Sequence, residues 1–212
     1  MADIFTTLRG LVGFRTYSSD QEVNFRAGKH GQFVVDPYGK YYQVAKDGFL
    51  WHAVTTDAGV APGTDSVATA QAVSLYNPPG SGVDLVILHA RMAYVSGTLG
   101  AGEMLWTKNT DSAAAAPTGT AMTISAGRLG GGAGVASAFQ AATVPVAPTL
   151  VRVFGSLDAS LATTATSPWV VVDEVDGAII VPPGMSINMA ADAAAGTTPL
   201  VSISITWAQV VA

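Results

Sequence analysis

The sequence contains no cysteine, and only 12% of its 212 residues are charged. The absence of cysteine excludes a disulfide framework and a thiolate metal site, so the fold must be stable without cross-links. The scarcity of charge leaves too few charged side chains to coat a monomer generously. We therefore expect copies of the chain, or a partner, to cover part of the surface. The alternative is a soluble monomer whose small Ala, Gly, Ser and Thr side chains form an uncharged surface.

Basic residues are also scarce. Ten Lys and Arg stand against 15 Asp and Glu, which gives a net charge of -5. The basic residues form no run, so the sequence lacks the footprint with which proteins bind nucleic acid. No apolar run approaches membrane-spanning length, and the first residues lack the features of a secretory signal. We expect no direct contact with nucleic acid or membrane, and synthesis in a cytoplasm.

Composition divides the chain into four parts. Residues 1–30 show no clear periodicity and predict an extended arm. Residues 31–56 predict a three-stranded β-meander, and residues 57–65 have the Gly, Pro and Asp content of a linker. Residues 66–212 are rich in Ala, Gly, Val and Thr and predict a β-sandwich.

The predicted meander follows from two turn signals. Asp36-Pro37-Tyr38-Gly39 separates Gln32–Val35 from Lys40–Val44, and Asp47-Gly48 separates Lys40–Val44 from a strand over Phe49–Val54. So small a sheet cannot bury both of its faces, so it must lie against another surface. Its aromatic residues are therefore candidate interface residues: Phe33, Tyr41, Tyr42, Phe49 and Trp51.

Residues 66–212 contain a series of strand candidates separated by turns. In the last strand, Val201, Ile203, Ile205 and Trp207 alternate with polar or small residues, which is typical of a strand with one buried face. About eight main strands with irregular connections favour an antiparallel jelly roll over an up-and-down barrel. The predicted strands are Val67–Tyr76, Val83–Val95, Glu103–Lys108, Ala121–Ala126, Val135–Ala142, Leu150–Gly155, Trp169–Val172, Ile179–Val181, Met185–Ala190 and Leu200–Val210.

The three histidines, His30, His52 and His89, lie far apart in the sequence, and none has a metal-ligand partner at a suitable spacing. Alternation within Val83–Val95 places His89 and Arg91 on the face opposite to the apolar residues. This face is either partly solvated or in contact with a neighbour. His89 and Arg91 therefore join the candidate interface residues.

The densest acidic cluster contains Asp173, Glu174 and Asp176. Its carboxylates could hold a calcium ion, but the cluster lacks the ligand ladder of a dedicated loop, which favours an ordinary hairpin turn. The glycine-rich segment Gly127–Gly134 lacks the Lys-Ser/Thr ending and the helix of a phosphate-binding loop. Because the sequence shows neither a nucleophile elbow nor a catalytic triad, we expect no enzyme activity and no cofactor.

Several segments together resemble the single jelly-roll structural proteins of bacteriophage virions. The resemblance spans roughly residues 66–212 and consists of a pattern of strands and turns. It is carried by Ser74–Pro79, Leu85–Leu88, Ala178–Met189 and Leu200–Trp207. This resemblance implies a non-enzymatic and usually trimeric particle protein, such as a capsid decoration protein or a fibre or spike head.

The leading hypothesis is a capsid decoration protein that forms a trimer and attaches to the major capsid protein, or another virion protein, through its N-terminal region. The alternative is a fibre or spike head that binds a host receptor or glycan on its loops. A hydrolase on a β-sandwich would require converging carboxylates or a triad, which the sequence does not show.

Overall fold

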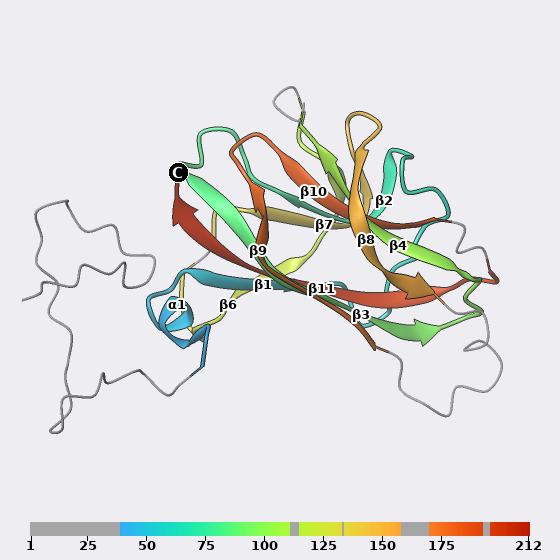
Figure 1. The fold of residues 1–212 in the computed structure, drawn as a ribbon, viewed down its shortest axis with the longest axis horizontal. Helices are drawn as coiled ribbons and strands as arrows, with labels where there is room; N and C mark the ends of the chain where they lie inside the picture. Colours follow the sequence, from blue (N-terminus) through green and yellow to red (C-terminus); the bar gives the residue numbers. More distant parts are fainter. Residues whose placement is uncertain (1–38, 111–114, 133, 158–169, 193–195) are drawn as a thin grey trace, which may run out of the picture.

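The computed structural model describes residues 39–110, 115–132, 134–157, 170–192 and 196–212. These residues form two antiparallel β-sheets that pack face to face (Figure 1). The predicted all-β sandwich is therefore confirmed. The predicted arm over residues 1–30 and the strand Gln32–Val35 lie outside the described residues.

The described part of the chain contains one short helix and eleven strands. In chain order they are α1 (Tyr42–Lys46), β1 (Leu50–Val54), β2 (Ala70–Tyr76), β3 (Val83–Ser96), β4 (Gly102–Asn109), β5 (Thr118–Ala121), β6 (Thr123–Ala126), β7 (Ser137–Thr143), β8 (Thr149–Leu157), β9 (Val170–Val181), β10 (Ser186–Asp192) and β11 (Leu200–Val211).

The connectivity is that of a jelly roll. Strands from the two halves of the chain pair in reverse order: β1 with β11, β2 with β10, β3 with β9 and β4 with β8. The five-stranded sheet has the order β6-β1-β11-β3-β9, and the six-stranded sheet has the order β5-β7-β2-β10-β4-β8. Two packed sheets of eight paired strands are the jelly-roll architecture, and β5, β6 and β7 are additions to it. These additions extend both sheets at the same side of the sandwich.

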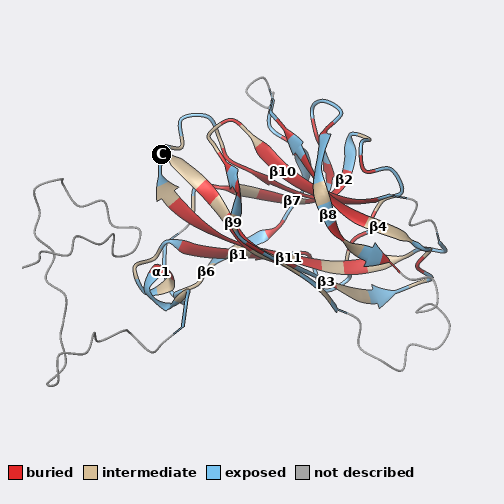
Figure 2. Ribbon diagram, in the orientation of Figure 1, coloured by how far each residue is buried: buried red, intermediate tan, exposed pale blue. Residues whose placement is uncertain are grey.

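The core lies between the two sheets (Figure 2). Alternation in β11 places Val201, Ile203, Ile205 and Trp207 in this core with no exposed surface, as the sequence pattern predicts. Trp106 of β4 lies in the same core and is also fully buried. Large aromatic and aliphatic side chains therefore supply the main apolar contribution to stability, at about 25 cal/mol for each Å² of apolar surface removed from water.

Asp173 of β9 ties the two sheets together at one side of the core. Its Oδ2 accepts a hydrogen bond of 2.7 Å from Trp106 Nε1, and its Oδ1 accepts one from the guanidinium of Arg152 on β8. β9 belongs to one sheet, whereas β4 and β8 belong to the other. The carboxylate therefore satisfies a buried indole and a cation from the facing sheet at once.

The predicted meander over residues 31–56 requires a correction. The predicted strand Lys40–Val44 is instead a turn that leads into the short helix α1. Gly39 (φ 88°) precedes this turn, and Gly48 (φ 82°) follows the helix. Tyr41, Val44 and Ala45, at positions i, i+3 and i+4, pack on Leu88 and Ala208 of the sheet, which favours a helical turn over a strand. The predicted strand Phe49–Val54 is β1, which belongs to the jelly roll itself.

The predicted linker over residues 57–65 is attached to both sheets. Val60 is buried and exchanges two backbone hydrogen bonds with Val201 of β11, at 2.8 and 2.9 Å. The carbonyl of Pro62 accepts a hydrogen bond of 2.6 Å from Ala191 N in β10 of the other sheet. This segment is therefore a bound crossover between the sheets and not a free connection between two domains.

The acidic cluster also differs from its prediction. Instead of a hairpin turn, residues 173–177 lie within the continuous strand β9. The register between β3 and β9 shifts between Ile87 and His89, and Asp176 (φ 49°) and Gly177 (φ 86°) adopt left-handed backbone conformations. The strand thus contains a bulge, which turns the Asp176 side chain toward Lys40 and Tyr41. We call residues 40–46, which include these two residues and α1, the α1 segment.

Candidate functional site

A row of polar residues crosses the outer face of the five-stranded sheet, with one residue from each strand. Cross-strand pairing places Ser125 beside His52, His52 beside Thr206, Thr206 beside His89, and His89 beside Glu174. The neighbours of His52 in β1, Trp51 and Ala53, are buried in the core, so His52 lies on the opposite face. The row therefore lies on the side of the sheet that faces away from the core.

At the centre of the row, two histidines share one hydroxyl group. Thr206 Oγ1 lies 2.8 Å from Nδ1 of His52 and 2.9 Å from Nε2 of His89. One hydroxyl can donate to the lone pair of one neutral imidazole and accept the N–H of the other. Both of these hydrogen bonds therefore form when both histidines are neutral.

The segment that leads into α1 lies against the sheet close to this row. Tyr41 Oη donates a hydrogen bond of 2.5 Å to Asp176 Oδ1, and its ring lies 6.1 Å from the His89 ring, centroid to centroid. Lys40 Nζ donates to the same oxygen at 2.6 Å and lies 3.7 Å from Glu174 Oε2. Two neighbouring residues of this segment are thus held by the carboxylates of β9.

These contacts shift the pKa values of the groups involved. Hydrogen bonds from Lys40 and then from Tyr41 lower the pKa of Asp176, and the bond to Asp176 raises the pKa of Lys40. Burial, followed by the bond to Asp176, raises the pKa of Tyr41. Burial lowers the pKa of His52, and burial together with the charge of Arg91 lowers the pKa of His89, although Glu174 opposes the shift.

The paired histidines predict that stability depends on pH. Because their folded-state pKa values lie below the ordinary value of 6.5, the unfolded chain binds more protons as the pH falls through this region. The free energy of unfolding should therefore be highest above pH ~7 and should decrease between pH ~7 and 5. Urea unfolding at several pH values measures this decrease.

The control is the double variant His52→Gln and His89→Gln, which retains His30 and every carboxylate. Its free energy of unfolding should change less over the same pH window, since the two titrating rings are gone. An identical pH dependence in the variant and the original chain would contradict the assignment.

The polar groups of this face hydrogen-bond mainly to one another. The described residues contain no group of three or more His, Asp or Glu side chains arranged to hold a metal ion. Within the same residues, the hydroxyl of Thr206 is hydrogen-bonded between two imidazoles, and the Asp176 carboxylate is bound by Lys40 and Tyr41. The helix described in the structure is also too short to cross a membrane.

The structure separates the candidate interface residues into different environments. The Tyr41 ring lies beside the His89 ring, and Arg91 is exposed one row further along β3. Tyr42 and Phe49 are 36% and 37% exposed, with Lys46 Nζ 5.6 Å from the centre of the Tyr42 ring. Phe33 lies outside the described residues.

Trp51 has a different role from the predicted one. It is 7% exposed and belongs to the main core between the sheets, so it leaves the set of surface candidates. Gly134, from the predicted glycine-rich loop, packs closely on it: a Cβ there would lie 3.0 Å from Trp51 Nε1 and 2.6 Å from Gln209 Nε2. The absence of a side chain at this position therefore allows the loop to pack closely on Trp51 and Gln209.

Six members of this site were not among the predicted interface residues: Lys40, His52, Ser125, Glu174, Asp176 and Thr206. Alternation does place His52 and Thr206 on the polar faces of their strands. However, the contacts of Thr206 with His89 and with His52 depend on strand pairing between residues that are 117 and 154 positions apart, respectively.

Comparisons of the chain with protein-family models, with curated proteins and with solved structures found no match.

Proposed function

We propose that this protein is a non-enzymatic structural protein of a virus particle, most simply a capsid decoration protein that assembles as a trimer. The resemblance of its strands and turns to phage virion proteins suggests the proposal, and the jelly-roll connectivity agrees with it. The observation that carries it is an apolar surface at one side of the sandwich.

This surface, the β8–β9 edge, is formed by the outermost strands of the two sheets. β8 pairs with β4 and β9 pairs with β3, and each has its other side free within the described part of the chain. At the opposite side of the sandwich, the outermost strands β5 and β6 have only four residues each. Six aliphatic side chains of the β8–β9 edge are 39% to 54% exposed: Leu150, Val151, Val153, Val170, Val172 and Ile180.

Long apolar edge strands are rarely left open to water, because their free backbone groups and side chains promote association. The low charge content of the chain adds to this argument. We therefore assign the β8–β9 edge to contacts within the particle, either between copies of the chain or with the shell.

The contacts of the α1 segment support attachment through the N-terminal region. Lys40 and Tyr41 are bound to Asp176, and Val44 is buried against the sheet. Residues 40–44, at the N-terminal end of the described chain, are therefore fixed to the outer face of the five-stranded sheet.

The assembly is tested by light scattering of the purified chain at micromolar concentration. A trimer is expected, and the double variant Val153→Lys and Val172→Lys should shift it toward monomer by placing charges in the contact. Val54→Lys is the matched control, because Val54 is 49% exposed on β1, away from this edge. A dispersed monomer of the original chain would overturn the trimer.

The location is tested separately by electron microscopy of particles that contain the protein. Density for the sandwich is expected on the outside of the shell. Particles whose structure does not include the protein would count against any virion role.

One observation favours the alternative, a fibre or spike head that binds a glycan. β11 presents Ser202 and Ser204 on the outer face of the sheet, beside the exposed Arg91 of β3, which pairs with Ser204. Hydroxyl and guanidinium groups on a shallow surface can bind sugar hydroxyls. A glycan array with specific hits that are lost in Arg91→Ala would support this function, and an array without hits would exclude the glycans it displays.

A further inference from the structure

We propose that the α1 segment is a latch that mild acid releases from the outer face of the five-stranded sheet while the sandwich stays folded. The segment packs on β1, β3 and β11 at the side of this sheet that faces away from the core (Figure 1). Its release would uncover an apolar patch on these strands. The latch does not depend on the proposed virion role.

The apolar contacts of the α1 segment are separate from the main core. They form a small cluster of their own, whereas the residues between the sheets form another. The members of the small cluster are Val44, Leu50, Leu88 and Ala208, with Tyr41, Ala45 and Val86 packed against them. Segments with few buried apolar contacts open at a lower free-energy cost than global unfolding. The α1 segment can therefore leave the sheet without opening the sandwich.

Two glycines border the segment and allow it to move as a unit. Gly39 and Gly48 have φ angles of 88° and 82°, and a Cβ at either position would meet no atom within 4 Å. The backbone can therefore change direction at both positions with little steric hindrance. The helix itself has only five residues, so it has little stability once it has left the sheet. Release and unwinding of α1 should therefore occur together, which makes its amides reporters of release.

The polar contacts that close the latch are exposed to water. Lys40 Nζ and Tyr41 Oη donate to a single oxygen, Asp176 Oδ1, at 2.6 and 2.5 Å. The side chains of Lys40 and Asp176 are 57% and 53% exposed. Exposed ion pairs add little stability. The closed position is therefore held by a small margin, which a change in one nearby charge can shift.

His89 supplies the sensitivity to pH. The Tyr41 ring lies 6.1 Å from the His89 ring, centroid to centroid, so the closed latch covers part of the imidazole. Burial, followed by the charge of Arg91, lowers the pKa of His89. Release of the latch would return the imidazole to water and raise its pKa toward the ordinary value of 6.5. The released state therefore binds more protons than the closed state as the pH falls below about 7, and acid shifts the equilibrium toward release.

Charged and titratable groups from several elements face His89. They are His52 on β1, Arg91 on β3, Glu174 and Asp176 on β9, and Lys40 and Tyr41 in the α1 segment. The shifted pKa values of Asp176, Lys40 and Tyr41 keep these three groups in their ordinary charge states between pH ~7.5 and ~5.5. A proton on His89 is therefore repelled by an unchanged cation at Lys40. Glu174 attracts the same proton and reduces this effect without cancelling it, because the pKa of His89 remains lowered.

The test is native-state hydrogen exchange of the full chain, followed by NMR at pH ~7.5 and ~5.5 and corrected for intrinsic exchange. The amides of Ala45 and Asp47 report on the latch, because they donate hydrogen bonds of 2.9 Å to carbonyls of the α1 segment. Their opening constant should increase by about fivefold at the lower pH, since one proton is coupled to release. The amide of Val201, which donates to Val60, should stay far more protected at both pH values. An opening constant that does not depend on pH, or latch amides as protected as Val201, would overturn the proposal.

Two matched variants locate the sensor. His89→Gln should abolish the increase, because the titrating ring is gone. His52→Gln should retain it, since His52 reaches Thr206 from β1, on the other side of β11. Asp176→Asn, which removes the charge that binds Lys40, should raise the opening constant at both pH values. An increase that persists in His89→Gln would overturn the assignment of this ring.

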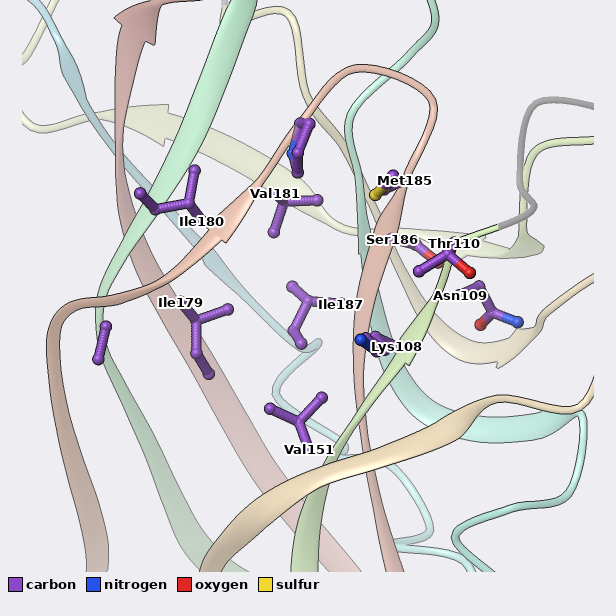
Figure 3. Close-up of a pocket in the computed structure, with 12 residues that line it drawn as sticks. Lys108, Asn109, Thr110, Val151, Ile179, Ile180, Val181, Met185, Ser186 and Ile187 are labelled. Atoms are coloured by element: carbon purple, nitrogen blue, oxygen red, sulfur yellow. The ribbon is translucent and has the colours of Figure 1, made fainter.

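A second measurement detects the uncovered patch directly. An uncharged nitroxide in solution broadens the methyl signals of the side chains that it reaches, so it should broaden those of Leu50 and Leu88 more at the lower pH. Ile179 and Ile187 are the reference, since they point into a groove beside the β8–β9 edge whose described lining includes no histidine or carboxylate (Figure 3). The broadening of their signals should not depend on pH. Equal increases at both places would show that the whole sandwich loosens and would overturn a separate latch.

Discussion

Replacing Asp173 by alanine should lower the free energy of unfolding by about 3 kcal/mol, because one carboxylate serves two groups of the opposite sheet. Trp106 is fully buried, and its indole N–H would lose the acceptor that lies 2.7 Å away. Arg152 would lose its ion pair in the same change. In a chain of this size, the loss corresponds to a decrease of roughly 6–12 °C in melting temperature.

Urea unfolding of the variant measures the effect, and Asp192→Ala provides the control. Asp192 is an exposed carboxylate at the end of β10, so its loss should change the free energy of unfolding by less than ~0.5 kcal/mol. Asp173→Asn should fall between the two, since an amide oxygen can still accept the indole N–H. Similar stabilities for Asp173→Ala and Asp192→Ala would show that the sheets are not joined by this carboxylate.

Replacing Asn188 by leucine should have an effect of similar size, also about 3 kcal/mol. Asn188 of β10 has no exposed surface, accepts a hydrogen bond of 2.7 Å from Ser74 Oγ and donates one of 2.9 Å to Asn109 Oδ1. Leucine has a similar volume, so the change removes hydrogen bonds and leaves the packing volume nearly constant. The buried hydroxyl of Ser74 would then have no acceptor at this position.

Thermal unfolding followed by circular dichroism measures this second loss. The network continues from Thr107 Oγ1, which donates 2.9 Å to Gln71 Oε1, so Thr107→Val should cost less than Asn188→Leu because it removes fewer bonds. Ser204→Ala, on the outer face of β11, is the control and should be nearly neutral. An unchanged melting temperature for Asn188→Leu would contradict a stabilising role of the network.

Much of the sandwich can be predicted from local sequence patterns. The alternation in β11 identifies both the strand and its buried residues, because a period of two is a property of the residues themselves. Turn signals likewise locate the ends of β2, β3 and β10 to within a few residues. Packing then preserves what the pattern predicts, since each of these strands buries one apolar face.

The predictions went wrong where tertiary contacts outweigh local preferences. The segment Lys40–Val44 lies between two turn signals, which predict a strand, yet it leads into a helical turn because Tyr41 and Val44 pack together on an apolar patch of the sheet. The acidic residues 173–177 have the composition of a turn, yet β3 holds them in a strand by pairing on both sides of a bulge. Local propensity is a weak guide when a partner strand is already in place.

The candidate site was still harder to predict, because its residues come together through strand register. His52 and His89 are 37 positions apart in the sequence, and neither pairs with the other directly. Thr206 joins them from the strand in between. A sequence pattern indicates which face a residue occupies, but it does not show which residue lies opposite on another strand.

The central position of β11 has a consequence for how the protein reaches its fold. β11 lies between β1 and β3 and supplies the pairing partner of both, although it is among the last residues of the chain. During synthesis, β1 and β3 therefore leave the ribosome with a vacant position between them, and the five-stranded sheet closes only when residues 200–211 arrive. Such distant pairing makes folding slow and leaves apolar strands open in the meantime. Completion of this sheet therefore requires residues 200–211, and a chain truncated before β11 should be prone to aggregation.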